Sequence, residues 1–334
     1  MKKLLRIGSK IALAGALATS FAFSQVQAAP ELTIKAAHAA SATNTGHLAL
    51  EFMDKELRER TDGAIGLEIF PNGQLGGERE LIESIQLGNI DMVFVSSAPL
   101  ASLNKQFFAL DMPFLFQDRE SVYKVLDGEI GQELLTSLEN VGIAGLGYWE
   151  NGFRQLTNDR GVVHSAGDVD GLDMRTMENQ IHLMAWRELG TNPAPLAFNE
   201  LYTALQQGTF EAQEGPINLF RDMRFDEVQK YISKTNHIYS PFVVLMNPDV
   251  QYRMSDEQQE IFRQVFQDAK AYQRGLAQKA DDAAATELEA KGVTITTLTP
   301  EQLKTFSSKM QPVYDRIKDI VGADFANRVI KAAQ

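Results

Sequence analysis

Apolar and polar positions in the first third of the chain follow two different periods. Alternation with a period of two residues predicts strands, and apolar residues three or four positions apart predict helices. The two patterns take turns, with strands expected over 32–36, 65–70 and 90–95 and helices over 48–57 and 81–85. This order of strand, helix, strand, helix, strand is typical of an α/β fold with a parallel sheet, right-handed crossovers and helices on both faces.

The pattern pauses at 150–152 and then restarts as another α/β unit. Before the pause, the sequence predicts a helix over 129–141, which Gly142 ends, and a strand over 143–148. The elements expected after the pause are a strand over 171–176 and helices over 180–189 and 198–207, the last with Asn199 as its N-cap. We therefore expect the chain to cross between two lobes near this pause.

A very long helix is predicted near the C-terminus. Ser255 and Gln258 form a capping-box pattern, and the following residues up to Lys291 contain no proline and only one glycine, Gly275. A helix of this length would reach about 50 Å, which is more than one compact domain needs, so it is expected to run across both lobes. The alternative is two helices broken at Gly275. The pattern at 299–302 predicts the start of another helix, with an N-cap, a proline at N1 and a glutamine at N3.

The first 28 residues have the three parts of a secretory signal peptide. Four basic residues within 2–10 precede an apolar stretch over 11–23, and small residues around Ala28 suit signal peptidase. The apolar stretch is shorter than the about 20 residues that span a bilayer, although a retained membrane anchor is the alternative. We therefore expect an exported, periplasmic protein that is cleaved near Ala28.

Composition excludes several classes of protein. With 334 residues, 44% of them hydrophobic and 23% charged, the chain is long enough for two globular domains. It contains no cysteine, which excludes disulfides, thiolate metal sites, cysteine nucleophiles and a lipid-modified cysteine. The formal charge is −12, and because the predicted signal carries four basic and no acidic residues, the remaining 306 residues carry −16. Such acidity argues against a nucleic-acid partner.

Catalytic and cofactor motifs are missing from the sequence. It has no nucleophile elbow, no phosphate-binding loop ending in Gly-Lys-Ser/Thr, no HExxH and no calcium-loop spacing. The glycines at 73–77 lack the dinucleotide-binding spacing and predict a tight turn with positive φ angles. The five histidines are not paired on any helical face, so no metal site is expected. We accordingly predict no catalytic residue and no cofactor.

Two arginines differ from ordinary surface arginines in their positions, and the end of a strand is where ligand crevices of open α/β sheets form. Arg154 follows the predicted lobe crossing, and Arg175 lies near the end of the predicted strand 171–176. From spacing alone, a structural ion pair is the alternative explanation for the strand-end residue Arg175.

At this point the sequence resembles a known family, the extracytoplasmic solute receptors of tripartite ATP-independent periplasmic (TRAP) transporters. The resemblance covers almost all of the chain after the signal, and six motifs carry it in order: Phe70-Pro71-Asn72-Gly73-Gln74-Leu75-Gly76, Leu110-Asp111-Met112-Pro113-Phe114-Leu115-Phe116, Asn151-Gly152-Phe153-Arg154, Gly171-Leu172-Asp173-Met174-Arg175, Phe198-Asn199-Glu200-Leu201-Tyr202-Thr203-Ala204-Leu205-Gln206 and Gln213-Glu214-Gly215-Pro216. It implies a two-lobed α/β fold of the periplasmic-binding-protein type, with a hinge, a central cleft and a long helix spanning both lobes. We expect lobe 1 to comprise 29–151 with 241–280, and lobe 2 to comprise 152–240 with 281–334.

The resemblance also implies roles for individual residues. Arg175 matches the arginine that pairs with the ligand carboxylate, Arg154 matches a second arginine that helps to position the ligand, and Phe198 matches an aromatic residue of the cleft. The family's Gln-Glu-Asn-Pro motif is Gln213-Glu214-Gly215-Pro216 in this chain, and its Glu214 is expected to bind the ligand. Because Gly215 replaces the asparagine, the usual asparagine contact is lost. Asn218 or a water molecule is expected to replace that contact. Positions in the first lobe that are expected to face the ligand are His38, Glu78, Ser96 and Ser97, for which turn-stabilising or capping roles are the alternative.

The implied function is the capture of an organic acid anion, a sugar acid or a C4-dicarboxylate, and its delivery to the membrane permease subunits of a transporter. The segment 178–180, Glu-Asn-Gln, favours a polyhydroxylated sugar acid. Two other functions stay open from the sequence: an exported enzyme acting on a small organic acid, and a periplasmic solute sensor. Nothing in the sequence requires more than a monomer.

Overall fold

The computed structural model describes residues 30–334, so the predicted signal peptide lies outside the described residues. Within this range the strands form one mixed sheet in the order β2-β1-β3-β9-β4-β7-β5-β6, in which β8 also pairs with β4, and β10 with β8. The strands are β1 (Leu32–Ala37), β2 (Ile65–Phe70), β3 (Met92–Ser96), β4 (Ala144–Asn158), β5 (Asp173–Thr176), β6 (Asn192–Pro195), β7 (Ala212–Pro216), β8 (Tyr231–Lys234), β9 (Tyr239–Met246) and β10 (Thr294–Thr297).

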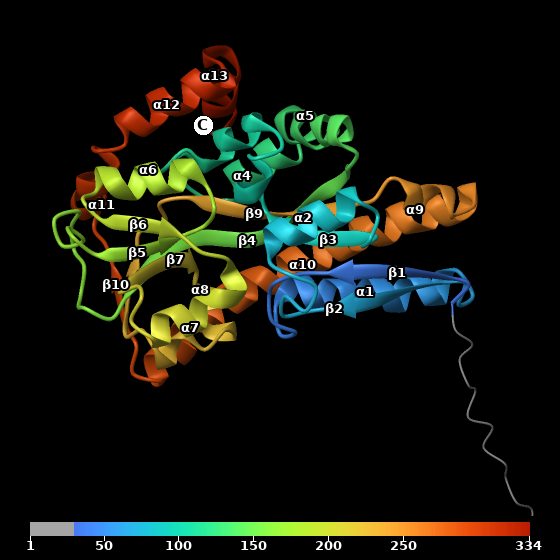
Figure 1. The fold of residues 1–334 in the computed structure, drawn as a ribbon, viewed down its shortest axis with the longest axis horizontal. Coiled ribbons are helices and arrows are strands. Elements are labelled where there is room, and N and C mark those ends of the chain that lie inside the picture. The colour runs from blue at the N-terminus through green and yellow to red at the C-terminus, as the bar shows by residue number, and fades with distance from the viewer. Residues whose placement is uncertain (1–29) are drawn as a thin grey trace, which may run out of the picture.

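Helices cover both faces of this sheet (Figure 1). The α-helices are α1 (Thr45–Arg60), α2 (Glu78–Gln86), α3 (Ser97–Leu100), α4 (Arg119–Leu126), α5 (Glu129–Ser137), α6 (Gln180–Glu188), α7 (Leu201–Gln206), α8 (Ile217–Asp222), α9 (Asp249–Tyr252), α10 (Asp256–Ala290), α11 (Pro300–Ser307), α12 (Gln311–Val321) and α13 (Ala323–Ala332). Four short 3₁₀ helices within residues 30–334 join them: η1 (Lys105–Asp111), η2 (Leu138–Val141), η3 (Phe198–Glu200) and η4 (Phe225–Glu227). None of the helices in residues 30–334 combines the length and apolar character needed to cross a membrane.

The predicted α/β fold is confirmed, but the sheet is parallel only in its outer parts. β1 pairs in parallel with β2 and β3, and β5 pairs in parallel with β6 and β7. At the centre, β9 pairs antiparallel with both β3 and β4. The predicted parallel pairing is therefore confirmed for β1, β2 and β3, the strands from which it was inferred, but it does not extend to the centre, where β9 and β4 run against the strands beside them.

The predicted pause at 150–152 is an irregularity inside one long strand, β4. This strand pairs with β9 up to Phe153 and with β7 from Arg154 onward, and its register shifts between Glu150 and Gly152. Gly152 has a φ angle of 127°, which side-chain-bearing residues rarely adopt. β4 thus belongs to both halves of the sheet and changes its pairing partners at the irregularity.

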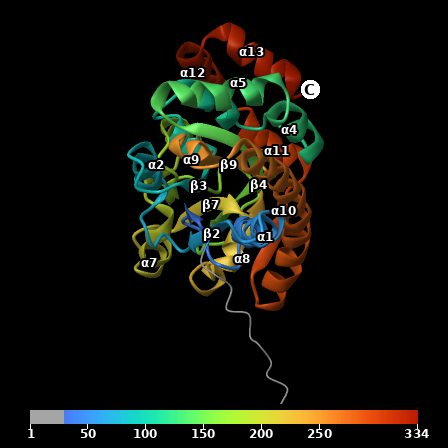
Figure 2. The ribbon, with the colours of Figure 1, turned by 90° about the vertical axis from the view of Figure 1, so that its right-hand side faces the viewer.

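Helix α10 is a single helix of 35 residues, and Gly275 does not break it. The predicted capping box of Ser255 and Gln258 is present at its start. Its buried N-terminal residues, such as Phe266, share a core with α1 and Trp149, whereas Leu288 near its end packs in a second core with Phe220 and Phe225. The helix therefore joins the cores of the two lobes along one side of the molecule (Figures 1 and 2).

The C-terminal helices contact elements on both sides of the predicted lobe boundary. α12 packs on η1 and α6, and α13 packs on η1 and α4. A large core that extends from α2 to α13 includes Phe107, Trp186 and Val313. The division into lobes at the expected residue numbers stays a prediction.

Capping residues and a terminal glycine lie at helix ends where the sequence predicts them. Thr299 and Gln302 form the capping box of α11, and Gly142 ends η2 with a φ angle of 75°. The expected helix 198–207 is instead η3 followed by α7, and Asn199 is not its N-cap, since no side chain caps either element. Asn199 lies inside η3.

Candidate functional site

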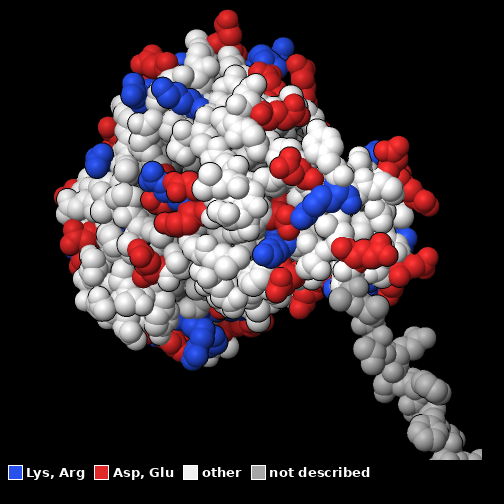
Figure 3. Space-filling view, turned by 45° about the vertical axis from the view of Figure 1, so that its right-hand side comes forward, with Lys and Arg blue, Asp and Glu red and all other residues white. Residues whose placement is uncertain are grey.

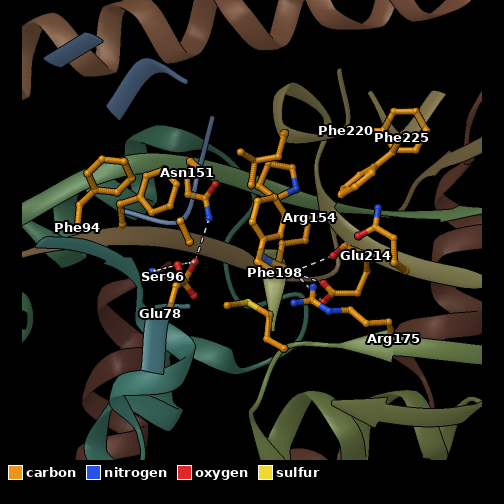
Figure 4. Close-up of a pocket in the computed structure, with 18 residues that line it drawn as sticks. Glu78, Phe94, Ser96, Asn151, Arg154, Arg175, Phe198, Glu214, Phe220 and Phe225 are labelled. Carbon is orange, nitrogen blue, oxygen red and sulfur yellow. Dashed lines mark hydrogen bonds and ion pairs between the residues drawn. The ribbon is translucent and has the colours of Figure 1, made fainter. Parts of the chain in front are cut away.

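A cavity lies where the two halves of the sheet meet (Figure 4). Its walls come from the segment that follows β1, from the start of α2, from β3, β4, β5, β7 and β9, and from η3, α8 and η4. The residues that line it are Ala39, Ala40, Glu78, Phe94, Ser96, Asn151, Arg154, Arg175, Met177, Phe198, Gln213, Glu214, Gly215, Pro216, Leu219, Phe220, Phe225 and Phe242.

Arg154 on β4 and Glu214 on β7 form a buried ion pair, because their strands are neighbours in the sheet. Arg154 Nε donates to Glu214 Oε2, and its Nη2 donates to Oε1 at 2.7 Å and to the Glu214 main-chain carbonyl at 2.8 Å. Burial alone would raise the pKa of Glu214, but Arg154 and two histidines outweigh it and hold this pKa well below its usual value. The charge of Arg154 is thus already neutralised within the protein.

The two histidines connect this pair to a deeper polar network. His237 Nε2 lies 3.1 Å from Glu214 Oε2, and His182 lies between Glu214 and Asp111, with Nε2 3.1 Å from Asp111 Oδ1. Burial opposes a charge on His182, but the two carboxylates outweigh it and raise its pKa to about 8. Asn179 donates to Asp111 at 2.8 Å and to the Ala98 carbonyl, so this part of the predicted sugar-acid segment 178–180 is occupied by protein contacts.

Arg175 on β5 is as deeply buried as Arg154 but has no anionic partner. Its Nε and Nη2 both donate to the carbonyl oxygen of Leu196, at 2.9 and 2.6 Å. Among residues 30–334, no carboxylate lies close enough to form an ion pair with it. Burial lowers the pKa of Arg175 to about 10, while Glu214 acts through space in the opposite direction, so the guanidinium stays charged at neutral pH. The cavity wall therefore carries a desolvated cation without a counter-ion.

Glu78, the first residue of α2, stands on the other side of the cavity (Figure 4). Its Oε1 accepts hydrogen bonds from the main-chain N–H and the hydroxyl of Ser96, at 2.7 and 2.9 Å. Burial raises the pKa of Glu78 despite these bonds and the nearby arginines. Asn151 Nδ2 lies 3.4 Å from Ser96 Oγ, and the buried Asn151 Oδ1 has no hydrogen-bond partner in the described part of the chain.

Six of the nine predicted site residues line the cavity: Arg175, Arg154, Phe198, Glu214, Glu78 and Ser96. The other three, His38, Ser97 and Asn218, are buried but are not among the lining residues. His38 stacks on Phe94, and its Nε2 lies 3.0 Å from His47 Nδ1, while Asn218 donates to the Asn151 carbonyl at 3.4 Å. Contact of these three residues with a ligand stays a prediction.

Sequence reasoning missed most of the apolar wall. Phe94, Phe220, Phe225 and Phe242 line the cavity, yet in the sequence they cannot be distinguished from ordinary core positions. At Gly215, where the resemblance to TRAP receptors predicts asparagine, an added Cβ would lie 3.5 Å from Gln213 Oε1 and 3.9 Å from Arg154 Nη2. These are ordinary contact distances, so the glycine leaves open space beside Arg154.

The turn before α2 lies against η3, next to the lining residues Glu78 and Phe198. A Cβ at Gly73 would lie 3.1 Å from Asn199 Cβ. At Gly77 a Cβ would lie 3.2 Å from Asn199 Oδ1, and Arg79 Nη1 lies 3.9 Å from Glu178 Oε1. The predicted tight turn is confirmed, with φ angles of 64° at Gly73 and 115° at Gly76.

The chain is similar to known bacterial solute-binding proteins. The family model of bacterial extracellular solute-binding proteins, family 7, matches residues 36–319. The 2,3-diketo-L-gulonate-binding periplasmic protein YiaO of Escherichia coli is 37% identical over 292 residues, which cover 86% of this chain and 88% of that protein.

Solved structures show the same similarity in three dimensions. The sugar acid binding protein DctPAm of Advenella mimigardefordensis, in complex with galactonate, has a TM-score of 0.89 at 32% identity and covers 92% of this chain and 99% of its own. A TRAP periplasmic solute binding protein of Sulfurospirillum deleyianum with bound succinate has a TM-score of 0.87 at 30% identity and covers 91% of this chain and 100% of its own.

Proposed function

Because this chain belongs to family 7 of the bacterial extracellular solute-binding proteins, the receptors of TRAP transporters, we propose that it captures the anion of an organic acid with Arg175 as the carboxylate clamp. The observation that supports this role is the buried guanidinium of Arg175, which lines the cavity and has no ion-pair partner among residues 30–334. A buried cation without a counter-ion is costly, and a bound carboxylate would supply the missing charge.

The geometry of a guanidinium favours this partner. It is planar and always charged, and its paired N–H donors match the two oxygens of a carboxylate, whereas a lysine ammonium is a point charge. The carbonyl of Leu196 already fixes Nε and Nη2 of Arg175, and Nη1 makes no hydrogen bond within residues 30–334. Such fixing lowers the conformational cost of binding a ligand.

The ligand class follows from the family and from the cavity. Relatives of this chain are named for diketogulonate and for C4-dicarboxylates, and solved structures hold galactonate or succinate. We infer that the ligand here is a sugar acid or a C4-dicarboxylate, held by Arg175, Arg154 and Phe198 on one side and Glu78 and Ser96 on the other. Ligand contacts from both lobes are complete only in the closed state, so binding shifts the equilibrium towards closure.

The remaining parts of the proposal concern the cell. We infer cleavage of the signal peptide near Ala28, action outside the cytoplasm as a receptor and not as an enzyme, and release of the ligand to the membrane permease subunits of the transporter. The two lobes are proposed to be 29–151 with 241–280 and 152–240 with 281–334, hinged at β4 and α10.

Titration calorimetry with organic acids tests the clamp. An acid that binds the wild-type protein is expected to lose affinity by about thirty- to several thousand-fold in Arg175→Ala, because truncating one partner of a buried charge pair costs roughly 2 to 5 kcal/mol. Arg175→Lys is expected to restore little of this affinity. Arg263→Ala, at an arginine whose side chain is 68% exposed, is the control and is expected to bind normally.

A loss below threefold in Arg175→Ala would refute the clamp. Recovery of the acid unchanged and in stoichiometric amount from the purified protein would support a receptor, whereas turnover of the bound acid would identify an enzyme.

A further inference from the structure

Four charged side chains line the cavity, and the charges of two of them neutralise each other. Arg154 and Glu214 form their own ion pair, in which both carboxylate oxygens are occupied. Arg175 and Glu78 remain, and they form no ion pair with each other. Within the described residues, the lining thus offers one free cation and one carboxylate that is bonded only to Ser96.

The remaining cation and anion stand apart. Arg175 projects from the end of β5, whereas Glu78 projects from the start of α2 in the other lobe, and Figure 4 shows them on opposite sides of the cavity. A ligand that places one carboxylate on Arg175 therefore extends its other end towards Glu78. Phe94 lies on the Glu78 side of the cavity in Figure 4, its ring packs against that of Phe242, and neither side chain provides a charge.

A second carboxylate at that end would find no cation. It would face Glu78, whose Oε1 accepts two hydrogen bonds that favour the carboxylate form, and repulsion between anions is strong in a poorly solvated cavity. A hydroxyl group would be accommodated instead, because Glu78 Oε2 and Asn151 Oδ1 are acceptors that no hydrogen bond within residues 30–334 occupies. A hydroxyl donates to either oxygen without adding charge.

We propose that this site selects monocarboxylates that carry a hydroxyl group at the end remote from the carboxylate, and that Glu78 is the residue that rejects dicarboxylates. The proposal rests on the proposed function of Arg175 and narrows its ligand class to hydroxylated monoacids of the sugar-acid type.

Two matched pairs of acids test the proposal by titration calorimetry. D-galactonate and galactarate differ only in a terminal CH₂OH or carboxylate group, and so do 4-hydroxybutanoate and succinate. The wild-type protein is expected to bind the monocarboxylate of a pair at least about ten times more tightly, because like charges brought together in a binding site cost several kcal/mol.

The variant Glu78→Gln keeps the shape of the side chain and removes its charge. It is expected to reduce the preference to below threefold, through tighter binding of the dicarboxylate. Glu83→Gln, on the same helix with a side chain that is 61% exposed, is the matched control and should keep the wild-type preference. Thermal melting of both variants verifies that they fold.

The outcomes separate this proposal from the proposed function. Equal or tighter binding of the dicarboxylate by the wild-type protein, or an unchanged preference in Glu78→Gln, would overturn the selection by Glu78 while leaving the receptor function intact. If none of the four acids binds the wild-type protein, the carboxylate clamp at Arg175 fails as well.

Discussion

Arg154 and Arg175 are both 3% exposed, yet they differ in their partners. Arg154 is matched by Glu214 inside the protein, whereas Arg175 is held by one main-chain carbonyl. The charge that the protein leaves uncompensated is the one that a ligand can use. A buried ion pair such as Arg154–Glu214 adds little net stability, but it fixes the orientation of the groups around it.

The buried network behind Glu214 makes stability depend on pH. The pKa of His182 is raised to about 8 in the folded protein, against about 6.5 for an unperturbed histidine. Its contribution to the free energy of unfolding is therefore full below pH 6.5 and is lost as the pH rises through 8. Its size is about 2 kcal/mol, since one pKa unit corresponds to about 1.4 kcal/mol.

Chemical denaturation between pH 6.5 and 9 checks this prediction. The wild-type protein is expected to lose stability over this range relative to His182→Gln, while His164→Gln, at an exposed histidine, should parallel the wild type. If the wild type and His182→Gln respond to pH in the same way, His182 is not charged in the folded state.

At the level of single residues, sequence and resemblance located the two arginines, Phe198 and the Glu78–Ser96 pair, because each belongs to a recognisable motif or a strand end. Neither the sequence nor the resemblance predicted that Asn151 lines the cavity, or that His182 and Asp111 belong to one hydrogen-bond network. His182 and Asp111 are 71 positions apart in the chain, and no local pattern indicates that the fold brings them together.

The turn before α2 and the 3₁₀ helix η3 act together at the mouth of the cleft. The glycines of this turn let it approach Asn199 closely. Unlike Gly73 and Gly76, Gly77 has an ordinary φ angle of −74°, so a side chain there causes no backbone strain. Substitution at Gly77 therefore tests the contact between the lobes separately from the conformation of the turn.

Gly77→Ala is expected to weaken ligand binding about tenfold while leaving the melting temperature of the ligand-free protein unchanged. Its Cβ would lie 2.9 Å from Glu80 Oε2 on the same helix, where the flexible end of the Glu80 side chain can move aside. It would also lie 3.2 Å from Asn199 Oδ1 and 3.5 Å from Ala197 Cβ, which opposes closure, and an obstacle of about 1.4 kcal/mol corresponds to this factor. Titration calorimetry of Gly77→Ala and of the double variant Gly77→Ala/Asn199→Ala measures this loss of affinity. The double variant should recover part of the affinity, and equal affinities of wild type and Gly77→Ala would contradict the contact.

At the level of elements, patterns of local origin were reliable. The capping boxes of α10 and α11 and the glycine at position 142 depend on residues a few positions apart, and all three were predicted. The antiparallel centre of the sheet was not, because β9 pairs with β3 across about 150 residues of chain and its continuous apolar run does not specify its neighbours or direction. The division of 198–207 into η3 and α7 was also missed.

The whole molecule is acidic but presents mixed charges at its surface. On the face in Figure 3, acidic and basic side chains are interspersed and no region of one sign dominates. The net charge, −12 for the whole chain and −16 without the predicted signal, repels an anionic ligand at long range, so attraction has to come from Arg175 at short range. Salt screens the long-range repulsion but has little effect on a buried contact.

Closure of the two lobes is expected to be measurable in solution. Small-angle scattering should show a smaller radius of gyration when a binding acid saturates the protein, because hinged lobes that close on a ligand, as proposed here, form a more compact molecule. The ring centroid of Trp149 lies 5.8 Å from that of Phe94, which lines the cavity, so the fluorescence of Trp149 is expected to change as well. An unchanged radius and an unchanged emission at saturation would exclude closure.

Helix α10 and strand β9 also determine when the first lobe can be completed during synthesis. Strand β3 has no partner on its inner edge until β9 has been made, and the core that contains α1 needs Phe266 from α10. Pairing over such distances in sequence is slow. The emerging chain therefore cannot finish its first lobe until most of it has left the ribosome, and an unfinished chain of this kind is suited to being threaded through a translocation pore.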